Sequence, residues 1–313
     1  MKINQMKKDE FFEGFYLIKT AEVRQTRAGK DYLALTFQDE TGEIEGKLWD
    51  AQPGKIKDFT AGTVVHMQGR REVYNNTPQV NQLVLRLPKA GEPNDPADFK
   101  EKPPVDVKDT KDYLNQMIFL IENATWQRIV RALYGKYEKE FYSYPAAKTN
   151  HHAFYSGLSF HTATMVRLAD KIGDIYPQLN KSLLFAGIML HDLAKVIELT
   201  GPDNTGYTVR GNLIGHISLI DEEITKVLME LGIDDSLEEV TVLRHVILSH
   251  HGLLEYGSPV RPQIMEAEIL HMIDNIDAEM MMMLSALDKV GPGEMTNRIF
   301  AMDNRAFYKP NLD

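Results

Sequence analysis

The feature that most constrains this chain is a series of apolar helical stretches that end in histidine or aspartate. The clearest is "FAGIMLHDLAK", residues 185–195, in which an apolar run ends at His191 and Asp192. Unpaired polar groups at the buried end of a helix cost free energy unless something binds them. The chain has no cysteine, so a metal ion bound there must be held by histidine and carboxylate side chains.

The same pattern recurs in four further segments, "GLSFHT", "GNLIGHI", "LSHHG" and "HMIDNID". A helical bundle builds a metal site in this way, because side chains from separate helices converge on its interior. Asp192 can bridge two ions through its two oxygens. We therefore predict two groups of metal ligands, the first being His161, His191, Asp192 and Asp274 and the second His216, His250 and His251.

Two questions about these ligands stay open at the sequence level. Adjacent helical residues point about 100° apart, so His250 and His251 can both reach one centre only at a helix end. Asp277 lies one turn beyond Asp274, and we expect it to support the ligands rather than bind an ion. The isolated histidines at positions 66, 245 and 271 are expected to be ordinary core or surface residues.

The chain divides by pattern into a strand-rich and a helical part. Residues 1–88 contain five short alternating segments separated by turn signals, which predicts a small all-β barrel. Residues 89–108 are rich in proline and charge and are predicted to form a linker. Residues 109–313 show helical periodicity almost throughout. The predicted fold is therefore multi-domain, an all-β barrel followed by an all-α helical bundle.

Charge and composition do not decide between the candidate functions. The net charge is −10, but residues 1–88 carry 13 Lys and Arg against 12 Asp and Glu, so the acidic excess lies in the remainder. An acidic half that attracts divalent cations is compatible with a nuclease and with a small-molecule hydrolase. No apolar run approaches the roughly 20 residues that span a bilayer, and no signal-peptide core follows the first lysines. We expect a cytoplasmic protein without a membrane partner.

Strand alternation predicts which barrel residues face solvent. In "KDYLALTFQD" and "GEIEGKLWD" the apolar residues alternate with Tyr32, Lys47 and Trp49, and the later turn "VYNNTP" adds Tyr74. Exposed aromatic rings beside basic groups bind single-stranded nucleic acid by stacking, and they also mark subunit or domain interfaces. The methionine-rich "AEMMMMLSAL" can form core or a subunit contact, so a homo-oligomer is compatible with the sequence.

The ligand order, together with Lys195 of "HDLAK", resembles the HD-domain metal-dependent phosphohydrolases in the variant that has extra histidines for a second metal. With the preceding barrel and "HHAFYSGLSFHT", nearly the whole chain resembles the YhaM family of 3′ to 5′ exoribonucleases, which combine an OB-fold with an HD domain. This resemblance implies manganese-dependent removal of nucleotides from the 3′ end of single-stranded RNA, with single-stranded DNA as a further candidate substrate.

Phosphodiester hydrolysis requires an activated water and positive charge on the phosphate oxygens, which two bound cations supply. We expect the attacking water beside Asp192, and Lys195 either on a phosphate oxygen or in a surface salt bridge. An imidazole-rich shell favours manganese, iron or zinc over magnesium. One of His151 and His152 is a candidate substrate contact, as is Arg210, although both can be ordinary loop residues.

Two other functions remain compatible with the sequence. One is an HD-type phosphohydrolase of small nucleotides, such as a nucleoside triphosphate or cyclic nucleotide, in which the barrel serves assembly. The other is a single-strand-binding protein with a vestigial metal site, which the complete ligand set disfavours.

Overall fold

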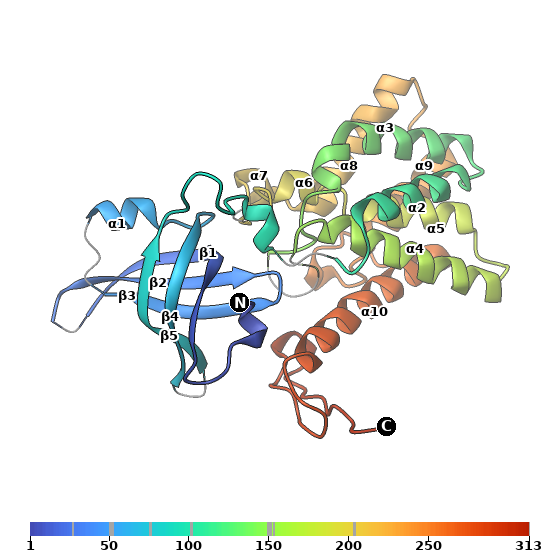
Figure 1. Cartoon of the computed structure of the whole chain (residues 1–313). Helices are drawn as coiled ribbons and strands as arrows, with labels where there is room; N and C mark the ends of the chain where they lie inside the picture. The colour runs from blue at the N-terminus through green and yellow to red at the C-terminus, as the bar shows by residue number, and fades with distance from the viewer. Residues whose placement is uncertain are drawn as a thin grey trace. The chain divides into compact units, whose positions relative to one another are not determined.

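A computed structural model describes residues 1–26, 28–49, 53–74, 77–100, 103–148, 152, 154–202 and 205–312. The candidate substrate contact His151 lies outside these residues. The chain forms two compact units, Met1–Lys102 and Pro103–Asp313, which are strand-rich and helical respectively (Figure 1). The two units are described separately below.

The first unit is a closed five-stranded barrel within the described residues. Its strands are β1 (Phe11–Gln25), β2 (Asp31–Asp39), β3 (Gly42–Leu48), β4 (Val64–Tyr74) and β5 (Thr77–Arg86). Their order around the barrel is β1-β2-β3-β5-β4, with β3 and β5 parallel and the other pairs antiparallel. This arrangement is consistent with an OB-fold and confirms the predicted barrel. The sequence pattern missed the short helix α1 (Pro53–Asp58).

The barrel core is built by the alternation that the sequence shows. On β2, Leu33, Leu35 and Phe37 are buried, and Ile44 and Leu48 of β3 are buried opposite them. Successive strand residues point to opposite faces, so the residues between them face outward. This register places Tyr32 and Trp49 on the outer face.

Part of the proline-rich segment packs on the barrel instead of forming a free linker. The 3-10 helix η2 (Pro96–Phe99) buries Phe99 against Leu17 and Val64. Arg86 donates two hydrogen bonds to Glu92, at 2.6 and 2.9 Å. Composition suggested a linker because proline and charge are common in both linkers and ordered loops. A second 3-10 helix, η1 (Ile3–Gln5), buries Ile3 at the start of the chain.

The second unit is helical. Its elements are α2 (Val107–Phe119), α3 (Ala124–Phe141), α4 (Gly157–Ile175), α5 (Lys181–His191), α6 (Lys195–Glu198), α7 (Val209–Ile214), α8 (His216–Leu231), α9 (Glu238–Leu248), η3 (Leu254–Tyr256), α10 (Met265–Leu287) and η4 (Phe300–Met302). Asn side chains cap α3 and α5, where Asn123 accepts from Trp126 N and Asn180 accepts from Leu183 N. The predicted helical bundle is confirmed.

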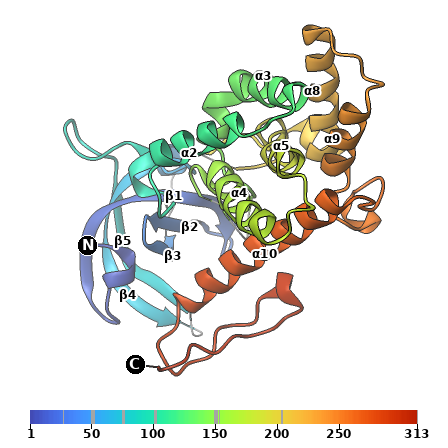
Figure 2. The ribbon, with the colours of Figure 1, turned by 90° about the vertical axis from the view of Figure 1, so that its right-hand side faces the viewer.

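Helix α5 is the central element of this bundle. Every residue from Ser182 to His191 is buried, which an apolar helix with no polar face requires. The helix packs against α3, α4, α9 and α10 (Figure 2). Its C-terminal end therefore places His191 and Asp192 inside the bundle.

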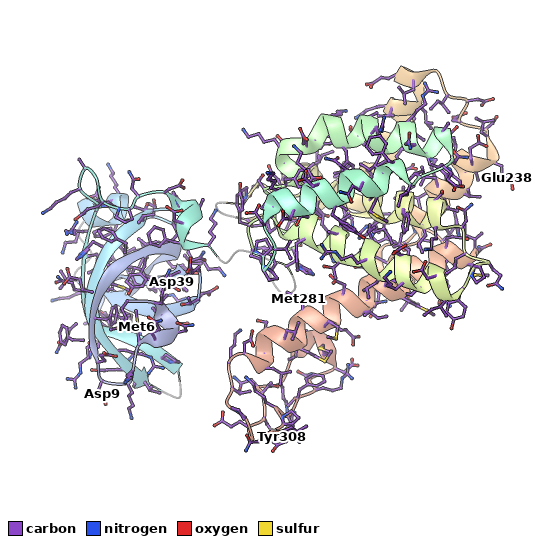
Figure 3. All side chains as sticks on the ribbon, turned by 45° about the vertical axis from the view of Figure 1, so that its right-hand side comes forward. Met6, Asp9, Asp39, Glu238, Met281 and Tyr308 are labelled. Carbon is purple, nitrogen blue, oxygen red and sulfur yellow. The ribbon has the colours of Figure 1, made fainter. Side chains whose placement is uncertain are left out.

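The methionine-rich segment forms the second half of α10. Met281, Met282 and Met283 are partly buried, while Met280 and Leu284 are about half exposed (Figure 3 labels Met281). The segment is thus neither a fully buried core nor a fully solvated surface. Among the described helices, none is both long and apolar enough to cross a membrane.

Candidate metal centre

Five helices of the second unit bring the predicted ligands to one place. His161 lies in the second turn of α4, and His191 is the last residue of α5. His216 is the first residue of α8, and Asp274 lies in the middle of α10. The pair His250 and His251 follows α9, which ends at Leu248. The ends of helices thus supply most of the side chains, as the sequence pattern predicts.

Asp192 lies between the two predicted groups and turns one oxygen toward each. Its Oδ2 is 3.4 Å from Nε2 of His191 and 3.7 Å from Nε2 of His161. Its Oδ1 is 3.4 Å from Nε2 of His216 and 3.9 Å from Nε2 of His250. Asp274 Oδ1 adds a contact of 3.3 Å to His161 Nε2. Asp192 therefore has the geometry of a bridging carboxylate.

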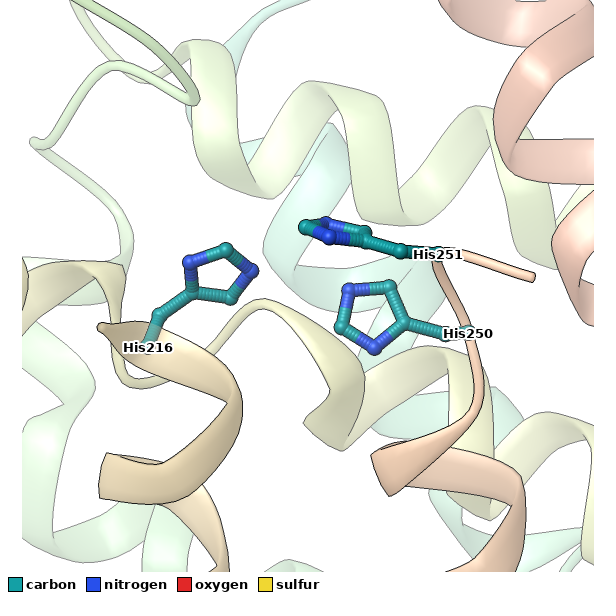
Figure 4. Close-up of side chains that lie close together, drawn as sticks. All are labelled: His216, His250 and His251. Carbon is teal, nitrogen blue, oxygen red and sulfur yellow. The ribbon is translucent and has the colours of Figure 1, made fainter. Parts of the chain in front are cut away.

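The second group is compact. One ligand atom from each of His216, His250 and His251 lies within 4.8 Å of the others. Figure 4 shows the His216 ring facing the two neighbouring rings that follow α9. Both histidines reach this place because the helix has ended before them, which removes the angular restriction on adjacent helical residues. In the first predicted group, His161, His191 and Asp192 meet the same distance criterion, with one ligand atom of each within 4.8 Å of the others.

Several buried polar atoms at this centre lack a hydrogen bond within the described residues. They are Asp192 Oδ1 and the Nε2 atoms of His191, His216 and His250. A buried polar atom without a partner is costly and requires an explanation. All four atoms surround the same space, and their chemistry is that of imidazole and carboxylate ligands. The donor set therefore fits divalent metal ions.

The other ring nitrogen of each predicted histidine ligand is held by an acceptor. Nδ1 of His191, His250 and His251 donates to the carbonyl oxygens of residues 188, 247 and 256 at 2.7, 2.6 and 2.6 Å. A carbonyl oxygen can only accept, so Nδ1 must carry the proton. In the neutral ring the lone pair is then on Nε2, which faces the centre, as in metal sites whose ligands are oriented by neighbouring acceptors.

Two carboxylates hold the remaining rings. Asp277 Oδ2 accepts from Nδ1 of His161 at 2.6 Å, and Glu198 Oε1 accepts from Nδ1 of His216 at 3.0 Å. The sequence placed Asp277 behind the ligands, and this geometry supports that assignment. Glu198 was missed, because its only sequence signal is a carboxylate one turn after Lys195 on a helix too short to show periodicity.

His152 lies behind the centre rather than on its surface. Its side chain is fully buried, and Nε2 is 2.6 Å from Asp277 Oδ2. A buried ring cannot contact a substrate in this conformation, so the predicted substrate contact is not supported. The sequence could not distinguish the two roles, because an adjacent histidine pair in a loop has no periodicity that shows burial.

The pKa values of several buried groups at the centre are shifted from their usual range. Burial opposes ionisation of Asp192, but the charge of Lys195 and the contact with His191 outweigh it and hold its pKa well below the usual range. Burial likewise opposes ionisation of Asp277, but hydrogen bonds from His152 and His161 lower its pKa to about 2. Burial lowers the pKa of His250, so this ring is neutral at neutral pH. Carboxylates are thus charged, while His250 is available as a ligand.

His161 is the exception among the rings. Burial opposes its charge, but hydrogen bonds with Asp274 and Asp277 outweigh burial and raise its pKa to about 10. The two carboxylates therefore attract positive charge to this position. A metal ligand must be unprotonated at its donor atom, so metal binding here competes with a proton.

Lys195 and Arg210 both form ion pairs. Lys195 Nζ lies 2.7 Å from Asp192 Oδ2, and its side chain is 12% exposed. This is a pair inside the centre rather than the surface salt bridge considered from the sequence. Arg210 is half exposed and pairs with Glu222 at 2.7 Å, so it stays a candidate for substrate contact.

His271 supports the backbone of His250. It lies one turn before Asp274 on α10, and its Nδ1 is 2.8 Å from the carbonyl oxygen of His250. Its ring also fills the space beside Gly252, where an added Cβ would lie 2.4 Å from the ring atoms. No role was predicted for His271, because a single histidine on a helix face is usually an ordinary core or surface residue.

The barrel residues predicted to bind nucleic acid lie on its outer face. The rings of Tyr32 and Trp49 lie 4.9 Å apart at 35°, and Trp49 is 54% exposed. Lys47 and Tyr74 are also exposed. The register adds two exposed acidic residues that the sequence reading did not weigh, since Glu45 pairs with Thr36 and Glu22 with Ala34 on the same face.

Two comparisons with known proteins give matches, and one of them lies in the helical unit. Residues 159–279 match the family model of the HD domain. Among solved structures, asparaginyl-tRNA synthetase of Entamoeba histolytica in complex with asparaginyl-adenylate matches at 14% identity with a TM-score of 0.23. That match covers 45% of this chain and 35% of the synthetase chain.

The HD match spans every predicted ligand. It begins two residues before His161 and ends two residues after Asp277. The centre described above thus lies inside the matched segment. An HD domain together with clustered histidine and aspartate side chains indicates that this chain contains a metal-dependent phosphohydrolase of the HD superfamily.

Proposed function

We propose that the protein is a 3′ to 5′ exoribonuclease that hydrolyses single-stranded RNA with two divalent ions, with manganese favoured. Single-stranded DNA is a further candidate substrate. The observation that supports this most is Asp192, which turns one oxygen toward each of two histidine groups in a chain that also has a barrel with exposed aromatic rings. The resemblance of the sequence to the YhaM family supports the direction of cleavage.

Divalent ions bound at this centre would neutralise the phosphate oxygens and lower the pKa of an attacking water. Side chains of the protein would position the ions and the substrate for that reaction. Asp192 places one carboxylate oxygen beside each histidine group. Lys195 donates to Asp192 Oδ2 and has further N–H donors for a phosphate oxygen of the substrate.

The outer face of the barrel supports binding of a single strand. Tyr32 and Trp49 form a tilted pair of neighbouring rings, against which a nucleobase can stack, and this kind of contact tolerates any base. Glu22 on the same face is paired with Arg24 at 2.6 Å, which reduces repulsion of the phosphate backbone. We therefore expect base stacking, rather than a strong basic surface, to dominate binding.

Digestion of a 5′-labelled single-stranded RNA with and without Mn²⁺ tests this proposal. We expect a ladder of products that shorten stepwise from the unlabelled end only when Mn²⁺ is present. A substrate whose 3′ end is covalently blocked serves as the matched control and should resist digestion. Release of the labelled nucleotide as the first product would reverse the direction, and cleavage of the blocked substrate would indicate an endonuclease.

A second candidate is an HD-type phosphohydrolase of small nucleotides. The exposed acidic residue Glu45 on the barrel face and the net charge of −10 favour it, since both weaken attraction of a long polyanion. In that case the barrel serves assembly. Turnover of free nucleoside triphosphates or cyclic nucleotides without any shortening of RNA would support this function instead.

A further inference from the structure

One buried carboxylate contacts a predicted ligand and is assigned no part in the reaction. Glu198 is 8% exposed and lies at the end of α6, one turn after Lys195. Its Oε1 accepts from Nδ1 of His216 at 3.0 Å and from the backbone N–H of the same residue at 3.1 Å. Glu198 therefore fixes both the ring and the main chain of His216.

The surrounding segment is built to hold this carboxylate in place. The Glu198 carbonyl oxygen accepts from Thr208 N at 2.8 Å, which ties α6 to the start of α7. Gly211 approaches the same carbonyl so closely that a Cβ there would lie 2.2 Å from the oxygen. The backbone of Glu198 is thus held against the first turn of α7.

The two histidine groups have separate carboxylate supports. Glu198 contacts His216, whereas Asp277 contacts His161 on the other side of the centre. The remaining predicted ligand rings donate to backbone carbonyls. A carboxylate that accepts from a ligating imidazole fixes its orientation and increases its basicity, which tightens metal binding.

We propose that Glu198 is a positioning residue that sets the affinity of the ion held by His216, His250 and His251, independently of the ion held by His161, His191, Asp192 and Asp274. This inference rests on the two-ion centre of the proposed function and concerns metal affinity alone. Loss of such a support typically weakens metal binding about 10- to 100-fold.

Titration of the metal-free protein with Mn²⁺, followed by calorimetry and by the signal of free Mn²⁺, tests the proposal. We expect Glu198→Gln to weaken one of two binding events about 10- to 100-fold and to leave the other unchanged. Glu222→Gln is the matched control, because it removes the same charge from an exposed position that pairs with Arg210 and Lys226. It should leave both binding events unchanged.

A double-mutant cycle assigns the affected ion. In a His216→Ala background, Glu198→Gln should have no further effect on Mn²⁺ affinity, since its partner ring is gone, whereas Asp277→Asn should still weaken the remaining ion. Parental affinity in Glu198→Gln, or an equal loss in the His216→Ala background, would overturn the proposal. If Glu198→Gln does not fold, Glu198→Asp tests the same point, because it keeps the charge but withdraws the carboxylate from His216.

These measurements contain no RNA, so they separate the inference from the proposed function. A protein that binds two ions with the expected dependence on Glu198 but degrades no RNA would retain the inference and lose the exonuclease. Binding of a single ion in the parent protein would overturn the inference, whatever its nuclease activity.

Discussion

Replacement of Gly252 by alanine should damage the turn that presents His250 and His251. Gly252 has a φ of +75°, in the left-handed region that favours glycine. An added Cβ would lie 2.4 Å from Cε1 and Nε2 of the His271 ring, which is closer than atoms can approach. The ring must therefore shift, which disturbs its hydrogen bond to the His250 carbonyl oxygen.

Two energetic costs set the expected size of the loss in metal affinity, namely backbone strain at residue 252 and weakening of the His271 hydrogen bond. A non-glycine residue in the left-handed region costs about 1–2 kcal/mol. Loss of the hydrogen bond between His271 and His250 costs about 0.5–1.5 kcal/mol. If both terms appear in metal binding, the affinity of the group containing His250 and His251 should fall roughly 10- to 300-fold.

Titration with Mn²⁺ and thermal unfolding of the metal-free protein measure this prediction together. Gly232→Ala is the matched control, because Gly232 also has a positive φ of +63° but has open space where a Cβ would lie. It should lower thermal stability without changing metal affinity. In a His271→Ala background, Gly252→Ala should cost less, since the clash is gone. Parental affinity for both ions in Gly252→Ala would refute the reasoning.

Three further perturbations test other parts of the molecule. Replacing both Tyr32 and Trp49 by alanine should weaken filter binding of long single-stranded RNA by about 1–3 kcal/mol per lost base stack and leave hydrolysis of a very short substrate intact; unchanged binding would assign the pair another role. His216→Ala should retain about one ion by elemental analysis and Asp192→Ala little or none, because Asp192 contacts both groups. Both variants should hydrolyse RNA much more slowly, and full activity in the His216 variant would contradict two-ion catalysis. Hydrogen bonds from Lys136, Lys226 and Tyr137 outweigh burial and lower the pKa of Glu223 to about 2 from 4.5, so its stabilising effect is present above pH 4.5 and is lost as the pH falls toward 2. Glu223→Gln should therefore be less stable than the parent near neutral pH, with the difference shrinking in acid; a constant difference in the denaturation midpoint across that pH range would contradict this linkage.

The barrel and the bundle were predictable because their patterns are local. In β2 the buried residues Leu33, Leu35 and Phe37 alternate with outward residues, so a period of two is visible within nine residues. Helix α5 is buried on all sides, and its apolar run directly marks a central helix. The short α1 was missed because six residues show less than two turns of helical periodicity.

The candidate metal ligands could be predicted from the sequence, whereas the residues that hydrogen-bond to them, such as Glu198 and His271, could not. A ligand such as His191 interrupts an apolar run, and that interruption is visible in the sequence itself. Glu198 and His271 act through hydrogen bonds to residues 18 and 21 positions away, and nothing local distinguishes them from ordinary polar residues. His152 shows the same limit, because its contact with Asp277 spans 125 positions.

This division also predicts how the centre should respond to mutation. The ligand rings converge on the Asp192 carboxylate, and each ring is held on its far side by an independent acceptor, whether a backbone carbonyl or a carboxylate. A support such as Glu198 contacts only one ring, so its loss should be confined to one ion. Asp192 contacts both groups, so its removal should weaken the binding of both ions. The hierarchy of metal loss among these variants therefore follows from how many rings each carboxylate touches, and not from its distance to the substrate.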